Sequence, residues 1–510
     1  MKHSLLFIAF LLFTFSSFAQ LRYTQTVFNK VDTIKDMEFA QSDWLNNMVS
    51  LLADYNIHIG ESKTIERPLY MDIYSPHDDT VSKRPAILFG FSGGFLKGSR
   101  HNDDMIAFCD SFARRGYVTA NFDYRIGMGA DVTMVFGIPI HVSISERNGA
   151  RTVYRAVQDS RAAIRFLKHN ANEFGIDTTK IYLAGSSAGG FVALHNLYMD
   201  KPDEIPPFAL GSPTLGNLDT LGIQGYDGRA NAIVSMWGAL QTPDLIENEQ
   251  RPALLIHGEE DDVVYFKKGV PLKTLIPDLD ALDFNIPETY GGYCIDTALI
   301  NRNIPHNTYF VPGKRHEFYG VKTGNFGDNG PNQYWDTVQW KISDFLFEQF
   351  RPIAEFEYDV QELTLNCFDN TANSTLSEWE FGDETIGNGS TVSHSFHSPG
   401  YYKIKLSSCN ANMACDTLSQ IVAIGNPTQV QTSFAPQIKL FPNPAIDQLH
   451  ISGIAENSRI EIIDLLGRTA IVANLSDSKT VDVSLLNTGI YILKIEREAG
   501  TYVQKFQKVN

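Results

Sequence analysis

Ser187 has the clearest capacity for chemistry in this chain. It is central to residues 185–189, which read GSSAG, with an apolar run at 181–184 before them and a helical pattern at 191–198 after them. Flanking glycines allow a tight strand-to-helix turn that exposes the serine hydroxyl, and the amide of Ala188 at the helix start can stabilise an oxyanion. The pattern predicts Ser187 as a nucleophile for acyl transfer.

A serine nucleophile needs a histidine to remove its proton and an acid to orient that histidine. Asp261 follows the apolar run 253–256, and His316 follows the next run, 308–311. Because the carboxyl ends of parallel strands meet at one edge of a sheet, we predict Asp261 as the acid and His316 as the general base. Asp262 is the alternative acid if the loop ends one residue later.

The loop after the apolar run 86–89 is rich in glycine. Residues 90–95 read GFSGGF, and glycines let backbone N–H groups approach a ligand oxygen. The loop is a candidate for the second half of an oxyanion hole, with a plain glycine turn as the alternative.

These residues need a scaffold that brings strand ends together. From about residue 67 to 350, runs of Val, Ile, Leu and Phe alternate with longer helical patterns, which predicts an α/β domain with a mostly parallel sheet over residues 20–351. The predicted buried strands are 86–89, 117–121, 181–184, 233–236, 253–256 and 308–311.

The remainder of the chain has a different character. Residues 1–19 have the basic end, apolar run and small-residue cleavage site of a secretory signal peptide, and no later run is long enough to cross a bilayer. Short alternating segments predict small all-β domains at 352–425 and 438–510, joined by a linker at 426–437. The net charge of −17 disfavours nucleic acid and anionic membranes as partners.

The five cysteines are odd in number, so at least one thiol is unpaired in the monomer. Cys367, Cys409 and Cys415 are near one another and could form a bridge among them, whereas Cys109 and Cys294 are far apart in the chain. No pair has the spacing of a zinc site, and no metal ligand set is predicted.

With these residues in place, residues 55–350 resemble the esterase and lipase branch of the α/β-hydrolase superfamily. Besides GSSAG, the resemblance rests on two segments: residues 114–125, from RRGYV to DYR, and residues 158–177, from QDSRAA to FGID. The resemblance implies Ser187 as nucleophile, Asp261 as the acid of an HGxxDxxV pattern and His316 as base, with no metal or organic cofactor.

In the resemblance, the family's HGGGF loop corresponds to residues 91–95, where Phe91 replaces the histidine and Ser92 the first glycine. The implied oxyanion amides are those of Ser92, Gly93 and Ala188. Residues 126–150 are apolar yet loop-like where family members carry a substrate-covering insertion, so they are expected to form a lid, an acyl pocket or a packed surface loop.

Two further resemblances concern the all-β regions. Residues 353–424 resemble a polycystic kidney disease (PKD) domain, a β-sandwich, through WEFGD at 379–383 and SPGYY at 398–402. Residues 440–491 are similar to the type IX secretion sorting domain through LFPNP, IIDLLGR and TGIY. That similarity implies export to the cell surface or medium with the type IX secretion machinery as partner.

The expected function is secreted ester hydrolysis through an acyl-enzyme on Ser187. The expected substrate is a polymer-linked ester, either a feruloyl or acetyl ester of polysaccharide or a polyester, with a small acyl ester as the alternative. Two other classes are possible from the sequence: a serine peptidase of the prolyl-oligopeptidase type, and a non-catalytic glycan-binding protein. Only about 65 residues precede the first hydrolase strand, too few for the propeller domain of such a peptidase.

Overall fold

The computed structural model describes residues 22–48, 55–136, 138–247, 251–272, 282–425, 439–452, 459–464, 469–475, 479–497 and 500–509. The chain divides into two compact units, of which the first contains the α/β domain with most of the following β-sandwich and the second contains the C-terminal β domain. Each unit is described by itself. The predicted signal peptide and the linker at 426–437 lie outside the described residues.

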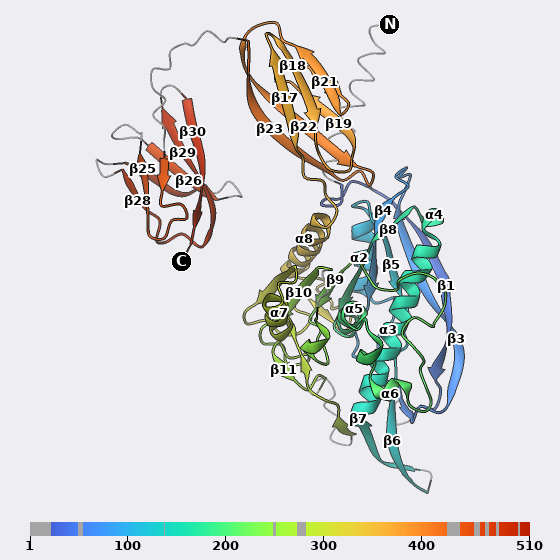
Figure 1. The fold of residues 1–510 in the computed structure, drawn as a ribbon. Coiled ribbons are helices and arrows are strands. Elements are labelled where there is room, and N and C mark those ends of the chain that lie inside the picture. The colour runs from blue at the N-terminus through green and yellow to red at the C-terminus, as the bar shows by residue number, and fades with distance from the viewer. Residues whose placement is uncertain are drawn as a thin grey trace. The chain divides into compact units, whose positions relative to one another are not determined.

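An eight-stranded sheet is the centre of the α/β domain (Figure 1), and its order is β1-β3-β5-β4-β8-β9-β10-β14. The first two strands pair in antiparallel fashion, and all pairs from β5 to β14 are parallel. The bounds are β1 Val31–Leu45, β3 Thr64–Pro76, β4 Arg84–Gly90, β5 Val118–Phe122, β8 Ile176–Ser186, β9 Ala232–Met236, β10 Ala253–Gly258 and β14 His306–Val311. The predicted α/β class is confirmed, with an antiparallel edge that the sequence reasoning did not include.

Helices cover the sheet and position the loops at its carboxyl edge. Their bounds are α2 Asp103–Ala113, α3 Glu146–His169, α4 Ala171–Phe174, α5 Ala188–Tyr198, α6 Pro207–Leu210, α7 Gly292–Asn301 and α8 Gln333–Glu348. α5 packs against β8 and β9, and each of its residues is buried. A helix that is apolar all round must be covered on every side, so α5 is anchored deep in the core.

A second sheet lies beside the main one, in the order β12-β7-β6-β2. Its bounds are β2 Ile57–Ile59, β6 Met128–Val135, β7 Ile138–Ser145 and β12 Leu282–Asn285. The loop-like reading of residues 126–150 is therefore corrected, because most of that segment forms a β-hairpin. Its glycines and Pro139 suggested a loop, whereas pairing with β2 and β12 supplies the hydrogen bonds that a strand needs.

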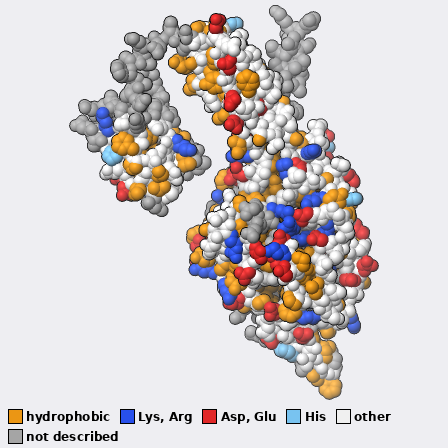
Figure 2. Space-filling view, in the orientation of Figure 1, with side chains coloured by type: hydrophobic (Ala, Val, Ile, Leu, Met, Phe, Trp, Pro, Cys, Tyr) orange, Lys and Arg blue, Asp and Glu red, His pale blue; other side chains and the backbone are white. Residues whose placement is uncertain are grey.

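The tip of this hairpin is apolar and exposed. Met134 and Val135 are 44% and 41% exposed, and Phe136 is fully exposed. Figure 2 shows hydrophobic side chains gathered at this end of the molecule, at the bottom of the view. Two short ribbons complete the domain: β11 Lys268–Gly269 with β13 Thr289–Tyr290, and β15 Val321–Lys322 with β16 Asn325–Phe326.

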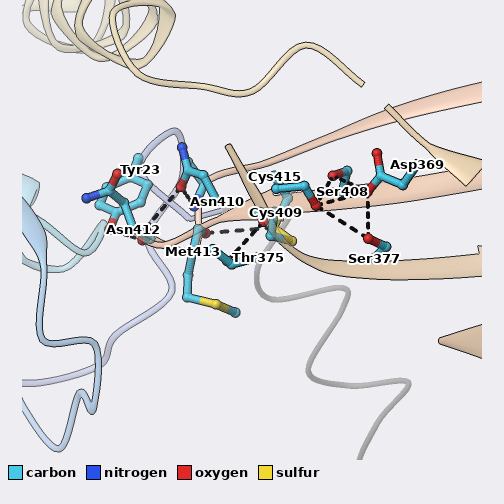
Figure 3. The surroundings of a disulfide bond; sticks show 12 residues. Tyr23, Asp369, Thr375, Ser377, Ser408, Cys409, Asn410, Asn412, Met413 and Cys415 are labelled. Atoms are coloured by element: carbon cyan, nitrogen blue, oxygen red, sulfur yellow. Dashed lines mark hydrogen bonds between the residues drawn. A yellow bond between two sulfur atoms is a disulfide. The ribbon is translucent and has the colours of Figure 1, made fainter. Parts of the chain in front are cut away.

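The β-sandwich has two sheets, β17-β18-β21 and β20-β19-β22-β23, around the buried Trp379. Its strands are β17 Phe356–Gln361, β18 Thr364–Asp369, β19 Ser374–Glu380, β20 Ile386–Asn388, β21 Thr391–Ser395, β22 Gly400–Asn410 and β23 Cys415–Ile424. A disulfide joins Cys409 to Cys415 and closes the loop between β22 and β23 (Figure 3). Cys367 is not part of this bridge and is a buried thiol.

The disulfide-closed loop contacts the α/β domain. The Asn412 side chain donates to the Lys83 carbonyl oxygen (2.7 Å), and the Asn412 carbonyl oxygen accepts from the Tyr23 hydroxyl (2.6 Å) (Figure 3). Asn410 donates to the Phe350 carbonyl oxygen at 2.7 Å. The sandwich is thus attached to the α/β domain by hydrogen bonds as well as by the chain.

The C-terminal unit contains two antiparallel sheets, β24-β25-β28 and β27-β26-β29-β30. Their bounds are β24 Lys439–Phe441, β25 Gln448–Ser452, β26 Arg459–Asp464, β27 Thr469–Asn474, β28 Thr480–Asp482, β29 Gly489–Arg497 and β30 Gly500–Lys508. An apolar core that includes Leu449, Ile462 and Leu493 lies within this unit. Across the described part of the chain, every helix is too short or too polar to cross a membrane.

Candidate active site

The turn between β8 and α5 holds Ser187 in a strained conformation, with φ 53° and ψ −111°. A Cβ on Gly185 would lie 2.0 Å from the Gly189 carbonyl oxygen, and one on Gly189 would lie 2.1 Å from the Gly90 carbonyl oxygen. Glycine is therefore required at both positions for a steric reason. Backbone strain at a polar residue is a frequent mark of a functional site.

The structure brings Ser187, His316 and Asp261 together. His316 Nε2 lies 2.8 Å from Ser187 Oγ, and His316 Nδ1 lies 2.7 Å from Asp261 Oδ2. A carboxylate only accepts hydrogen bonds, so Nδ1 carries the proton and Nε2 is left to accept from the serine hydroxyl. This is the arrangement in which a histidine can remove the serine proton.

Asp261 is held as an anion. Its Oδ1 accepts from the amides of Val263 and Val264, both at 2.9 Å, and Oδ2 lies 3.2 Å from Nε2 of the buried His257. Burial would raise the pKa of Asp261, but the charges and hydrogen bonds of His316 and His257 outweigh burial and hold the pKa well below its usual range. The adjacent Asp262 pairs with Arg315 instead.

The electrostatic surroundings of His316 favour its protonated form. Burial would lower the pKa of this imidazole, but the Asp261 carboxylate and its hydrogen bond raise the pKa above the usual value. The group therefore gains a proton more readily than a histidine in water, which suits a base that must take a proton from a hydroxyl.

The glycine-rich loop is fastened to the elbow. The Gly189 amide donates to the Phe91 carbonyl oxygen at 3.0 Å, and the Tyr124 hydroxyl donates to the same oxygen at 2.7 Å. The Phe91 and Tyr124 rings also stack, with centroids 4.0 Å apart. Tyr124 thereby supports the loop at the position where the resembled family has a histidine.

The three candidate oxyanion residues are placed differently. Ala188 is the first residue of α5, so its amide has no partner within the helix, and Gly93 lines a cavity together with Ser187. Ser92 is fully buried and lines neither of the cavities that meet at Ser187. Gly94, which was not predicted, lines both cavities.

An apolar cavity of about 490 Å³ opens at Ser187. Its volume is in the range of pockets that bind small organic molecules. The wall is formed mainly by apolar side chains from seven separate segments: Phe95, Met128, Val153, Phe191, Ile205, Pro207, Phe208, Leu245 and Ile286.

A second cavity, of about 460 Å³, also reaches Ser187. It is lined by His316 and by charged side chains, namely Lys97, Asp262, Arg315, Glu317 and Lys322. We call the two the apolar cavity and the charged cavity.

One wall of the apolar cavity belongs to residues 199–231, the irregular segment between α5 and β9, which we call the wall segment. Side chains of α3 hold it by donating to its backbone carbonyl oxygens. The donors are Arg147, Arg151, Tyr154, Gln158, Arg161, Arg165 and Lys168, and the acceptors belong to Met199, Phe208, Ser212, Pro213, Leu215, Gly216, Asn217, Leu221, Ile223 and Asp227. Arg151 is 1% exposed and also pairs with Glu61.

The sequence reasoning did not identify this helix face or Tyr124. The spacing of Arg147, Arg151 and Arg155 by four residues was a usable signal, because it places three cations on one face of a helix. Asp36, Asp72 and His101 lie close enough together to hold a metal ion. Because Arg100 already pairs with both acids, this cluster is a weaker sign of a functional site.

Comparison with known proteins identifies three segments. Residues 141–206 match the family BD-FAE, residues 354–424 the PKD domain, and residues 439–509 the secretion system C-terminal sorting domain. The predicted PKD and sorting domains are therefore confirmed, and the sorting domain marks a secreted or cell-surface protein.

Curated relatives match parts of the chain. A fumonisin B1 esterase from Sphingopyxis macrogoltabida is 30% identical over 130 residues, which are 25% of this chain and 22% of that protein. Endo-1,4-beta-xylanase B from Butyrivibrio fibrisolvens is 23% identical over 49% of this chain and 34% of its own length. The chain thus spans about a third or less of the length of these relatives.

Among solved structures, a propionate-bound thermophilic esterase from Thermogutta terrifontis is 21% identical, with a TM-score of 0.36. The alignment covers 56% of this chain and 90% of that one.

Proposed function

We propose that the protein is a secreted serine esterase that acts through an acyl-enzyme on Ser187. The chain joins an α/β-hydrolase domain to a PKD domain and a sorting domain. The observation that carries the proposal is the hydrogen-bonded chain from Ser187 through His316 to Asp261. The name of one relative that matches part of the chain, a fumonisin B1 esterase, agrees with ester chemistry.

In the proposed reaction, His316 Nε2 takes the Ser187 proton while Oγ attacks the ester carbonyl carbon. The imidazolium is stabilised by Asp261 and then gives the proton to the leaving alkoxide as the carbon–oxygen bond breaks. Water, deprotonated by the same nitrogen, attacks the acyl carbon; the bond from that carbon to Ser187 Oγ breaks, and His316 returns the proton to Oγ as the acid is released. Each proton transfer uses a histidine nitrogen at hydrogen-bond distance from the serine oxygen.

The oxyanion of the tetrahedral intermediate would be stabilised by backbone amides. We propose Ala188 and Gly93 as donors, with Gly94 in place of Ser92, because Gly94 borders the cavities at Ser187 whereas Ser92 is enclosed. An oxyanion donor must lie where the charge develops, and an enclosed residue does not meet that condition as well.

The proposed substrates are polymer-linked esters, either acyl esters on polysaccharide or a polyester. Support comes from the secreted location and the PKD domain, and from the similarity to a protein named endo-1,4-beta-xylanase B. This step rests on analogy with other domain combinations.

The experiment is hydrolysis of chromogenic acetyl, butyryl, octanoyl and feruloyl esters by the full mature chain, with Ser187→Ala as the control. We expect release of the chromophore by the native protein and a loss of about 10⁴-fold or more in the variant. Equal rates for the two proteins would exclude Ser187 as nucleophile, and release from peptide substrates alone would favour a peptidase.

A further inference from the structure

The apolar and charged cavities meet at the nucleophile. Ser187, Gly94 and Leu272 are the residues that line both cavities. A Cβ on Gly94 would lie 2.9 Å from a Leu272 methyl carbon, so these two residues are in close contact at the boundary between the two cavities. An ester whose carbonyl carbon is at Ser187 Oγ must therefore extend one group into each cavity.

The position of His316 distinguishes the two sides. His316 lines the charged cavity and not the apolar one, whereas Ala188 and Phe191 line the apolar cavity and not the charged one. The histidine that took the serine proton must deliver it to the leaving alkoxide oxygen, so the alcohol must depart on the side of His316. The acyl group then occupies the other side.

Resting on the proposed esterase function, we propose that the apolar cavity binds the acyl group and the charged cavity binds the alcohol. The substrates are then esters of an apolar acid with a polar alcohol that carries a negative charge. In the first step the Ser187 Oγ–carbonyl bond forms, the carbonyl–alkoxide bond breaks toward the charged cavity, and the alkoxide takes the proton from His316 Nε2.

The charge preference follows from two lysines. Arg315 is paired with Asp262, whereas Glu317 accepts from the neutral Thr323 amide and forms no ion pair among the described residues. Lys97 and Lys322 form no ion pair among the described residues, and Lys97 Nζ lies 4.1 Å from the centroid of the Tyr55 ring. The three cations that line this cavity (Lys97, Arg315 and Lys322) outnumber its two acids (Asp262 and Glu317), so in a chain with net charge −17 the cavity has a local excess of one positive charge.

A set of four substrates tests both halves of this assignment. Butyryl and octanoyl esters of glycolate and of glycolamide differ separately in acyl length and in the charge of the alcohol. The acyl-side variant is Val153→Phe, which narrows the apolar cavity from α3. The alcohol-side variant is the double change Lys97→Gln with Lys322→Gln, and Lys63→Gln is its control because Lys63 is exposed and lines neither cavity.

The native protein should prefer glycolate over glycolamide esters by roughly 5-fold to 10-fold in kcat/KM, about the effect of one favourable charge interaction near a protein surface. The double lysine variant should no longer prefer glycolate over glycolamide esters in kcat/KM, and it should keep the native octanoyl-to-butyryl ratio. Val153→Phe should lower the octanoyl-to-butyryl ratio by roughly 10-fold and keep the charge ratio. Lys63→Gln should change neither ratio.

The reverse pattern, in which the lysines control acyl length and Val153 controls charge preference, would overturn the assignment. A native protein that hydrolyses glycolamide esters as fast as glycolate esters would overturn the charge preference. If all four esters are hydrolysed no faster than by Ser187→Ala, the esterase function itself fails, and the assignment fails with it.

Discussion

The elbow around Ser187 and the wall segment at 199–231 both border the apolar cavity, but different forces hold them. The elbow is fixed by close backbone contacts that exclude side chains at Gly185 and Gly189. The wall segment contains little regular structure and is fixed by polar side chains of α3 that bond to its carbonyl oxygens. Close backbone contacts thus position the reacting atoms, whereas side-chain hydrogen bonds, together with apolar packing on α3, position the pocket wall.

The largest expected effect is a loss of activity on substitution of the acid that orients His316 toward Ser187. Asp261→Asn should lower kcat by about 10⁴-fold, because the amide no longer fixes the productive His316 tautomer. Asp262→Asn should cost less than about 3-fold, since its partner is the exposed Arg315. Steady-state kinetics on one ester compares the two variants. Equal losses at both positions would remove Asp261 from its proposed role.

A pair of glycine substitutions tests the steric part of the comparison. Gly189→Ala should lower the free energy of unfolding by about 3 kcal/mol or more, because its Cβ would overlap the Gly90 backbone. Gly211→Ala in the wall segment should change it by less than about 1 kcal/mol, since the nearest atom to that Cβ is 3.6 Å away. Urea denaturation measures both, and similar losses would show that the two regions do not differ in this respect.

Arg151→Met tests the hydrogen bonds of the wall segment. It should cost about 2–4 kcal/mol of unfolding free energy, because Arg151 is buried and its loss leaves the Phe208 and Pro213 carbonyl oxygens without this donor. Arg147→Met removes a single bond, to Ser212, at the surface, and should cost less than about 1 kcal/mol. Thermal and urea unfolding of both variants gives the contrast. No greater loss in Arg151→Met would mean that packing alone holds the segment.

The smallest expected effect is a shift in the pH dependence of kcat/KM. The neutral form of His316 is the active one, and its raised pKa should place the acid limb of kcat/KM above pH 6.5. The same raised pKa contributes stability at pH below the unfolded value that is lost as pH rises through the folded value. Weakening the Asp261 interaction in Asp261→Asn should move the limb downward. A limb below pH 6.5 in the native protein would contradict the pKa direction.

The sequence predicted those parts of the molecule whose physical cause is local. The parallel strands follow from continuous apolar runs, and Ser187, Asp261 and His316 follow from their places at strand ends, although their catalytic roles stay predictions. The hairpin of β6 and β7 was missed because its outer edges pair with β2 and β12, which are distant in the chain and which its own residues do not reveal. Ser92 was predicted as an oxyanion donor and Gly94 was not, because residue order alone does not show which amide borders a cavity.

The way in which α3 holds the wall segment also bears on how this protein can change over generations. Arg151 bonds to the backbone carbonyl oxygen of Phe208, which every amino acid supplies, so this support does not depend on the side chain at position 208. Asp219, by contrast, is held through its own carboxylate by Arg161 and Arg165. Phe208, which faces the apolar cavity, can therefore be exchanged while its support stays in place. Single substitutions in this segment can therefore change the acyl preference of the protein while the residues that carry out the reaction stay the same.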